Sequence, residues 1–401
     1  MTVQQIYQLM NTVTGEVLGK TDLVKEDLSN VVDVGTEVFN ASAVDNYVKA
    51  LVNHIGKVVF INRPYSGKIP SVLMDGWEFG SVLEKISCDT PAASENESWE
   101  LTNGTEYKQD IFYQPTVSAK FFNSKVTFEV PMSFTERQVK QSFSNAAQLN
   151  GFISMIYNAV DRSMTIKIDS LVMRTINSMI AQTLNADKTG FTGGYGTAST
   201  ARCVNLLKLY NDKFFPATGS TANPDALTAD KAIYDPGFIR FASYTMGVYI
   251  DRLASISTLF NVGGKDRFTD ANNLHVIMLS DFAKGADVYL QSDVRHNELT
   301  RLPNYETVPY WQGSGQNYEF DSTSAINVQI DASTTVAIKG IVGVMFDRDA
   351  LGVANLDRRV TTAYNAKAEF FNNYYKFDAG YFNDTNENFV VFFVSDEKTG
   401  S

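Results

Sequence analysis

The chain has 401 residues, of which 44% are apolar and 20% are charged, and this composition excludes intrinsic disorder as the main state. Its 34 Lys and Arg and 45 Asp and Glu residues give a net charge of −11, which disfavours tight binding to nucleic acid because a negative surface repels phosphate. Two cysteines and the lack of a long apolar run argue against a disulfide framework, secretion and membrane spanning. The length predicts about two or three domains.

Residues 1–55 are predicted to form an N-terminal arm and one helix, because apolar residues recur three and four positions apart in Ala43–Val52. From Gly56 to Met132, β-branched and aromatic residues are broken by turn signals, which predicts strands and hairpins. The clearest strand is Val126–Met132, where apolar and polar residues alternate. Pro131 places this strand at the edge or end of a sheet, because proline has no N–H to donate.

A long helix is the strongest local signal. Ser133 and Glu136 fit a capping box that would start a helix, with an interruption near Gly151. No Gly or Pro follows until Gly190, and about 33 helical residues would span roughly 50 Å. Both a beam that crosses the molecule and a central core helix fit this pattern. The apolar positions with three-and-four spacing are Phe152, Ile153, Ile156, Tyr157, Val160, Met164, Ile168, Leu171, Val172, Ile176, Met179 and Ile180.

A mixed α/β module is predicted after the helix. The segment Gly190–Gly196 lacks the Lys and Ser or Thr that end a phosphate-binding loop, so we interpret it as a linker. Helical patterns and one short apolar strand then follow, in the order 201–214, 240–260, 275–279 (the strand) and 281–290.

The last 60 or so residues are predicted to be rich in strands. A strand over Ile338–Phe346 runs into Asp347, whose side chain is placed to cap a turn. Phe370–Phe382 and Phe389–Val394 are separated by a turn-rich stretch, which predicts that they pair as antiparallel strands.

Residues suited to catalysis are scarce. The chain has three histidines, His54, His275 and His296, and none lies in a metal-binding spacing. Nucleophile-elbow, Walker and dinucleotide-binding motifs are absent from the sequence. Asp347 and Asp349 could in principle serve glycoside hydrolysis, but 45 acidic residues make chance pairs expected. We therefore predict no catalytic residue, no metal site and no cofactor.

The segment from 84 to 110 is strongly acidic. It is predicted to form either a solvated hairpin or an acidic arm that docks on a basic patch of a neighbouring subunit, with Arg358 and Arg359, or Arg137 and Lys140, as the acceptors. Its acidic residues are Glu84, Asp89, Glu95, Glu97, Glu100, Glu106 and Asp110.

The order of these elements, together with several short patterns, resembles the major capsid proteins of tailed bacteriophages, and within them most the short-tailed picovirus group. The likeness spans nearly the whole chain and rests on patterns rather than on catalytic signatures. The segments that carry it are Val52–Phe60, Asn150–Val160, Phe346–Leu351, Phe371–Tyr375 and Val390–Val394.

The resemblance implies an α+β fold, the tailed-phage major capsid fold. It implies an N-terminal arm and helix in 1–55, an extended β-hairpin called the E-loop together with P-domain strands in 56–132, and the spine helix of the P-domain in 133–189. An inserted A-domain would occupy 190–340, and 341–401 would return to the P-domain strands. Some related proteins continue into an immunoglobulin-like domain, which is not expected here.

The same resemblance implies a structural protein that self-assembles in many copies, as hexamers and pentamers, into an icosahedral or prolate shell around double-stranded DNA. DNA would be enclosed without sequence-specific binding, assembly would take place in the host cytoplasm, and a scaffolding protein and a portal are possible partners. The E-loop would lie across a neighbouring subunit, because a two-stranded projection is only marginally stable alone. The aromatic residues Trp77, Phe79, Phe112 and Tyr113 are then expected contacts between subunits, besides Glu95, Glu97 and Glu100.

Two other classes of protein are compatible with the sequence. An encapsulin, a cellular compartment built on the same fold, would hold a cargo protein rather than DNA. An enzyme, for example one that acts on carbohydrates, would be a defined monomer or dimer with paired carboxylates in a pocket.

Overall fold

The computed structural model consists of two compact units that contain both helices and strands, which confirms the predicted α+β class. The first unit comprises Met1–Gly80, Ser124–Val172 and Val353–Tyr381, and the second comprises Ser81–Asn123, Met173–Gly352 and Phe382–Ser401. The residues that the structure describes are 3–19, 24–27, 29–40, 46, 50, 69–74, 83–91, 93–107, 110–135, 137–138, 146–188, 199–217, 223–291, 305–311 and 326–396.

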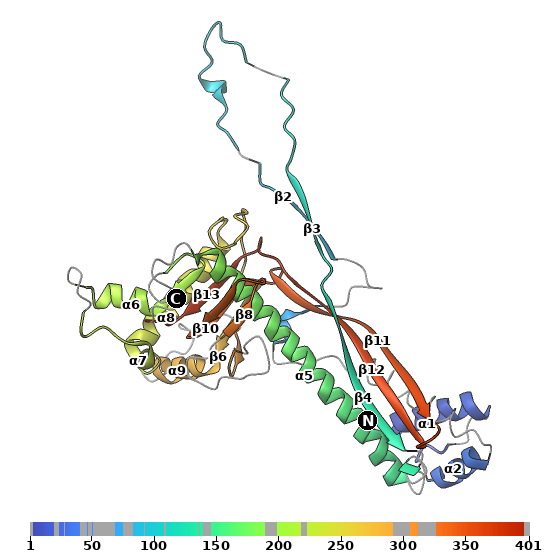
Figure 1. Ribbon diagram of the computed structural model, residues 1–401. Helices are drawn as coiled ribbons and strands as arrows, with labels where there is room; N and C mark the ends of the chain where they lie inside the picture. Colours follow the sequence, from blue (N-terminus) through green and yellow to red (C-terminus); the bar gives the residue numbers. More distant parts are fainter. Residues whose placement is uncertain are drawn as a thin grey trace. The chain divides into compact units, whose positions relative to one another are not determined.

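The first unit is built on a four-stranded sheet with the strand order β1-β11-β12-β4. Its long strands β11 and β12 lie side by side in Figure 1. The strands are β1 (Leu73–Met74), β4 (Lys125–Thr135), β11 (Leu351–Asn365) and β12 (Phe370–Asn383), and the helices near the N-terminus are α1 (Val3–Leu18) and α2 (Val31–Asn40), with the 3-10 turn η1 (Pro70–Val72) before β1.

Strand β4 is the outermost strand of this sheet, as Pro131 predicts. It runs antiparallel to β12, with Pro131 opposite Tyr374. Along β4, Val126, Phe128, Val130 and Met132 are more buried than the residues between them, so the predicted alternation is confirmed. The Phe128 ring lies 5.1 Å from the Phe377 ring across the ladder, which is the kind of cross-strand pair that stabilises a sheet.

Helix α5 (Ala146–Ala186) is the predicted long helix, and it has 41 residues. The expected interruption at Gly151 is wrong: the helix runs through it without a break. A glycine inside a helix costs only about 1 kcal/mol relative to alanine, and the many buried apolar residues that follow outweigh this cost. From Leu171 to Leu184 the helix is buried on almost all sides, which is typical of a core helix.

The predicted capping box at Ser133 is also wrong, because β4 continues through Thr135. Ser133 faces Asn372 across the sheet instead, with 2.5 Å between Oγ and Oδ1. The reciprocal cap lies two residues later. The Gln138 N–H donates to Thr135 Oγ1 at 3.2 Å, and the Thr135 N–H donates to Gln138 Oε1 at 2.9 Å.

The second unit is built on a five-stranded sheet with the order β5-β13-β10-β6-β7. Every residue of the central strand β10 is buried, and so is every residue of β13 beside it. The strands are β5 (Cys203–Asn205), β6 (Leu274–Leu279), β7 (Tyr305–Val308), β10 (Ile341–Asp347) and β13 (Phe389–Phe393), with the separate pair β8 (Ile326–Gln329) and β9 (Thr335–Ile338).

Helices of the second unit pack with this sheet, and they confirm the predicted mixed α/β module. Asp235 caps α8: its Oδ1 accepts the Phe238 N–H at 2.7 Å, and Pro236 occupies the first turn. The predicted linker at Gly190–Gly196 lies outside the described residues. The helices are α6 (Leu206–Phe214), α7 (Ala229–Ala232), α8 (Pro236–Ala254) and α9 (Ser280–Gln291).

The predicted pairing of Phe370–Phe382 with Phe389–Val394 is wrong, because β12 and β13 lie in different sheets. Strand β12 pairs with β4, and β13 pairs with β10 and β5. The range 341–401 is thus divided between the two sheets. At the start of β10, Gly340 has φ +75°, and a Cβ there would overlap the carbonyl oxygen of Val394, so both the angle and the space require glycine.

Candidate assembly interface

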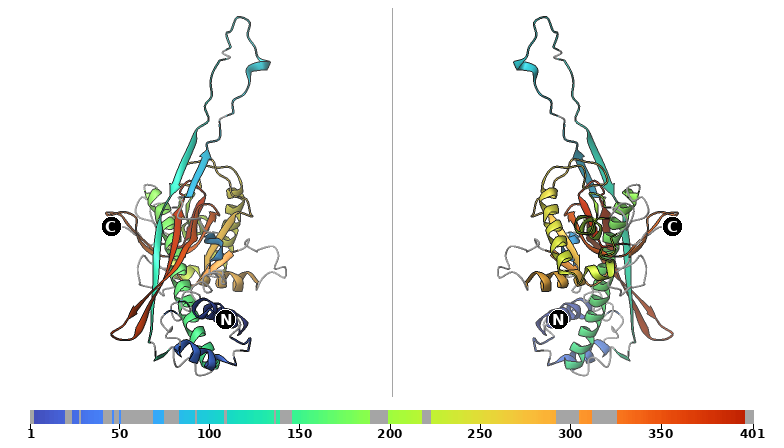
Figure 2. Two further views of the ribbon diagram at one scale, coloured as in Figure 1. Left: turned by 90° about the vertical axis from the view of Figure 1, so that its right-hand side faces the viewer. Right: turned by 90° about the vertical axis from the view of Figure 1, so that its left-hand side faces the viewer.

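The hairpin formed by β2 (Leu83–Cys88) and β3 (Val117–Phe122) belongs to the second unit. Its ladder runs from Leu83 opposite Phe122 to Cys88 opposite Val117. Beyond the ladder, the described residues 89–91, 93–107 and 110–116 extend as two arms outside the named strands, and the 3-10 turn η3 (Glu97–Trp99) lies near the far end (Figures 1 and 2). We call the ladder the hairpin base and residues 89–116 the distal segment.

The distal segment exposes large apolar side chains. Trp99 is 96% exposed, Phe112 is 85% exposed and Tyr113 is 82% exposed, which is more than for any other exposed aromatic residue described in the unit. Leu101 and Ile111 are exposed as well. Large apolar side chains that are exposed together in one segment mark a contact with another molecule.

Exposed carboxylates lie among these apolar residues. Glu95, Glu100, Glu106 and Asp110 are all exposed, while Asp89, at the end of β2, instead forms an ion pair with Lys265 at 2.7 Å within the same unit. The sequence groups Asp89 with the others, but the structure separates it from them. The distal segment therefore presents both aromatic rings and negative charge, and a complementary surface would be apolar with basic residues around it.

Three of the predicted basic acceptors are described, and they belong to the first unit: Arg358 and Arg359 in β11, and Arg137 just after β4. Arg359 is exposed and holds Asp378 at 2.7 Å, and this hydrogen bond lowers the pKa of Asp378. Arg358 is half-buried, and burial lowers its pKa. Arg137 is exposed. Docking of the acidic segment on these residues stays a prediction.

The side chains of four predicted contact residues are not described by the structure. Trp77, Phe79 and Lys140 lie outside the described residues, and of Glu97 only the backbone turn is described. Sequence reasoning missed Trp99, Leu101 and Ile111. The signal that could have identified them is the presence of large apolar residues in a stretch otherwise made of polar residues and turn formers.

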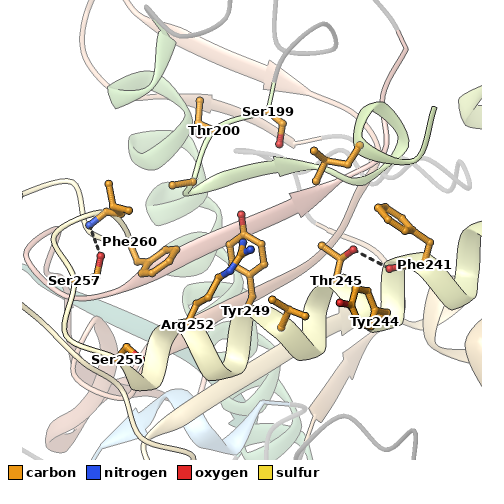
Figure 3. A pocket seen from close by; sticks show the side chains of 14 residues that line it. Ser199, Thr200, Phe241, Tyr244, Thr245, Tyr249, Arg252, Ser255, Ser257 and Phe260 are labelled. Atoms are coloured by element: carbon orange, nitrogen blue, oxygen red, sulfur yellow. Dashed lines mark hydrogen bonds between the residues drawn. The ribbon is translucent and has the colours of Figure 1, made fainter. Parts of the chain in front are cut away.

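A second apolar surface lies on the second unit beside α8. It is an open groove of about 760 Å³, lined by Tyr244, Tyr249 and Arg252 of the helix and by Leu259 of the following loop (Figure 3). The Arg252 guanidinium lies 5.2 Å from the centre of the Tyr249 ring, a cation–π contact. Among the described residues that line the groove there is no Asp or Glu, so it does not supply the two carboxylates that glycoside hydrolysis needs.

The candidate catalytic residues have structural roles where they are described. Asp347 Oδ1 accepts the Asp349 N–H at 2.9 Å, and Asp347 Oδ2 accepts the Thr269 hydroxyl at 2.7 Å, so the predicted turn cap is confirmed. His275 packs against the Phe346 ring, and burial lowers its pKa. His54 and His296 lie outside the described residues.

Within the described part of the chain, no cluster of three or more His, Cys, Asp or Glu side chains could hold a metal ion. None of the helices described there is long and apolar enough to cross a membrane.

Comparisons with known proteins agree with the fold. A chain in the structure of the head fibre and inner core protein gp22 of bacteriophage P68 is 8% identical, with a TM-score of 0.50, and the match covers 84% of this chain and 86% of that one. The capsid structures of Staphylococcus phage Andhra and of cyanophage P-SCSP1u contain chains 7% and 9% identical, with TM-scores of 0.47 and 0.41. These matches cover 83% and 82% of this chain and 86% and 87% of those chains. No curated protein matches the sequence significantly.

The family comparison covers almost the whole sequence. The model of the Phi29-like phage major capsid protein family matches residues 10–235 and 239–393. The predicted resemblance to tailed-phage major capsid proteins is thus confirmed, together with the structural role in the virion capsid that it implies. The chain belongs to the Phi29-like phage major capsid protein family and is a structural subunit of a phage shell.

Proposed function

We propose that the subunit builds the shell by laying the distal segment of its hairpin on a second copy of the chain. The observation that carries this proposal is the exposure of Trp99, Phe112 and Tyr113 on an extension without a core of its own. A two-stranded extension is marginally stable in water, and burying these rings against a partner would stabilise both the extension and the contact.

The domain names of tailed-phage capsid proteins can be assigned on this basis. The hairpin 81–123 corresponds to the E-loop, and the four-stranded sheet with the first part of α5 corresponds to the P-domain. The five-stranded sheet and its helices correspond to the A-domain. This assignment gives β10 and β13 to the A-domain, whereas the sequence groups them with the P-domain, because both strands are buried at the centre of the five-stranded sheet.

The proposed assembly is a closed shell of hexamers and pentamers, icosahedral or prolate, that forms in the host cytoplasm around double-stranded DNA, with a scaffolding protein and a portal as partners. The net charge of −11 supports a container rather than a DNA-binding protein. A basic lining would hold the genome and hinder its packaging and release.

The experiment is negative-stain electron microscopy of the purified protein, together with gradient sedimentation, for the chain alone and co-expressed with its genomic neighbours. We expect closed shells, tubes or capsomer rings in at least one of the two conditions, and DNA rather than a cargo protein inside shells taken from infected cells. A stable monomer or dimer under both conditions would contradict the proposal.

A further inference from the structure

The hairpin base carries two lysines that face each other directly. Lys85 of β2 and Lys120 of β3 are opposite residues in the ladder, and both are half-buried. Like charges in this position repel each other and destabilise the pairing of the strands. A hairpin with this pair therefore needs a counter-charge that reaches both ammonium groups.

Asp384 supplies that counter-charge. Its Oδ2 lies 3.0 Å from Lys85 Nζ and its Oδ1 lies 2.9 Å from Lys120 Nζ, so a single carboxylate contacts both strands. The side chain of Asp384 is only 2% exposed. Its backbone N–H donates to the Ala350 carbonyl at 2.7 Å, and its Oδ1 also accepts the Asn386 N–H at 3.1 Å, so the carboxylate is held in place by the folded core.

Further charges surround this contact. Glu387 Oε1 lies 2.7 Å from Lys85 Nζ and 3.2 Å from Arg267 Nε. Asp89, where the distal segment begins, binds Lys265. We call these side chains the base ion-pair cluster. Its members are four cations, Lys85, Lys120, Lys265 and Arg267, and three carboxylates, Asp89, Asp384 and Glu387.

Apolar packing fixes the same region. The Phe122 ring, at the end of β3, lies 5.1 Å from the Phe382 ring, which precedes Asp384 by two residues. Gly263 packs on the 384–388 loop: its N–H donates to the Thr385 carbonyl at 2.9 Å, and a Cβ at Gly263 would overlap Asn386. The loop that carries Asp384 is thus confined between the hairpin base and the core.

We propose that Asp384 is a positioning residue that fixes the direction of the hairpin in the single subunit, before any second copy is bound. The two lysines attach the two strands to one carboxylate, so the base behaves as a rigid support for the distal segment. The consequence for shell assembly rests on the proposed function, but the fixation itself is a property of the isolated chain and can be tested without assembly.

The cluster is suited to this role because its central carboxylate, that of Asp384, is shielded from solvent. The buried carboxylate of Asp384 is screened by salt much less than exposed charges are, so the hairpin base keeps its position at salt concentrations that weaken contacts between subunits. Removing a buried partner leaves the remaining charges uncompensated, which is far more disruptive than removing an exposed one.

The test is hydrogen exchange on the unassembled full-length chain, taken from the top of a sedimentation gradient. In D384N we expect exchange in residues 83–88 and 117–122 to become faster by more than about tenfold, because the two lysines then repel each other. The matched control is E129Q, which breaks the exposed cross-strand pair between Glu129 and Lys376 in the other sheet. In that variant the hairpin base should exchange as in the wild type.

A second set of variants keeps the test decisive if D384N folds poorly. The lysine side chains are 25% and 38% exposed, so K85Q, K120Q and the double variant should fold. Each single variant should accelerate exchange at the base, and D384N added to K85Q/K120Q should accelerate it much less than D384N alone, because the three groups act as one unit. Unchanged exchange at the base in both D384N and K85Q/K120Q, or purely additive effects, would overturn the proposal.

Assembly provides a separate readout. If D384N loosens the hairpin base and also yields open sheets or irregular shells by electron microscopy, both proposals hold. If D384N loosens the hairpin base but still forms normal shells, the proposal that Asp384 fixes the hairpin stands. The idea that shell assembly depends on the direction of the hairpin would then be wrong.

Discussion

The hairpin base and the distal segment belong to one hairpin, yet they use charged and aromatic residues in opposite ways. At the base, Lys85 and Lys120 are paired with buried carboxylates, and the Phe122 ring packs on the core. In the distal segment, Glu100 is exposed and Trp99 is almost fully so. Ion pairs thus fix the charges of the base within the subunit, although Phe121 of the base is 62% exposed, whereas the rings of the distal segment are left for a contact with another copy.

The largest expected effect comes from removing the exposed rings. The triple variant W99A/F112A/Y113A should fold normally and form fewer than about a tenth of the wild-type shells, because aromatic residues of this kind dominate the energetics of interfaces. Sedimentation and electron microscopy measure the shells. Y234A, which removes a ring that is 67% exposed elsewhere in the same unit, is the control and should assemble normally. Full assembly of the triple variant would contradict the account.

Buried rings should show the reverse pattern. Phe392 is fully buried in β13, and its ring lies 5.3 Å from the Tyr249 ring. F392A should lower the free energy of unfolding by about 3–5 kcal/mol, because the change removes contacts and leaves a cavity. W99A should change it by less than about 0.5 kcal/mol. Thermal or denaturant unfolding of the unassembled chain measures the free energy of unfolding of both variants. If F392A and W99A lost equal amounts, the buried and the exposed rings would not differ in their contribution to folding.

Acid should loosen the base. Burial acts to raise the pKa of Asp384, but the hydrogen bond from Lys120 and the charge of Lys85 outweigh it and hold the pKa below its usual range. A carboxyl whose pKa is lower in the folded state stabilises that state fully above about pH 4, and this contribution is lost as the pH falls through the folded pKa. The thermal midpoint of the wild type should therefore fall more steeply than that of D384N below about pH 4. If the thermal midpoints of the wild type and of D384N fell in parallel with pH, Asp384 would not contribute to the stability of the folded chain.

The smallest effect is expected from the exposed carboxylates of the distal segment. The variant E95Q/E100Q/E106Q should leave the stability of the subunit within about 0.5 kcal/mol of the wild type, because exposed charges contribute little to folding. Assembly should become less sensitive to salt if these groups face a basic surface. Light scattering across a salt series measures this sensitivity, and an unchanged series would show that the rings act without the carboxylates.

The sequence predicts the elements whose pattern is local. The long helix follows from a run of apolar residues with helical spacing, and the outer position of β4 follows from Pro131. The start of the following helix shows the limit of this reasoning. Two overlapping capping boxes are present, at Ser133 and at Thr135, and only the pairing of Thr135 with Phe370 across the sheet decides between them.

Features that depend on distant residues could not be predicted. Asp384 contacts Lys120 across 264 positions of sequence, and no local pattern indicates such a pair. The turn-rich stretch after β12 predicts a hairpin with β13. In the structure β12 pairs instead with β4 and β13 with β10, and the two pairs lie in separate sheets. The acidity of the segment and two of its rings, Phe112 and Tyr113, predict the candidate interface from the sequence, whereas the exposure of Trp99 is visible only in the structure.

The most direct test of the central claim is a cryo-electron microscopy map of the assembled shell at a resolution that shows side chains. The account predicts that the Trp99 and Phe112 rings are buried against a second copy of the chain, while Asp384 still contacts Lys85 and Lys120 of its own chain. A distal segment that lies in solvent, or that contacts only its own subunit, would contradict it.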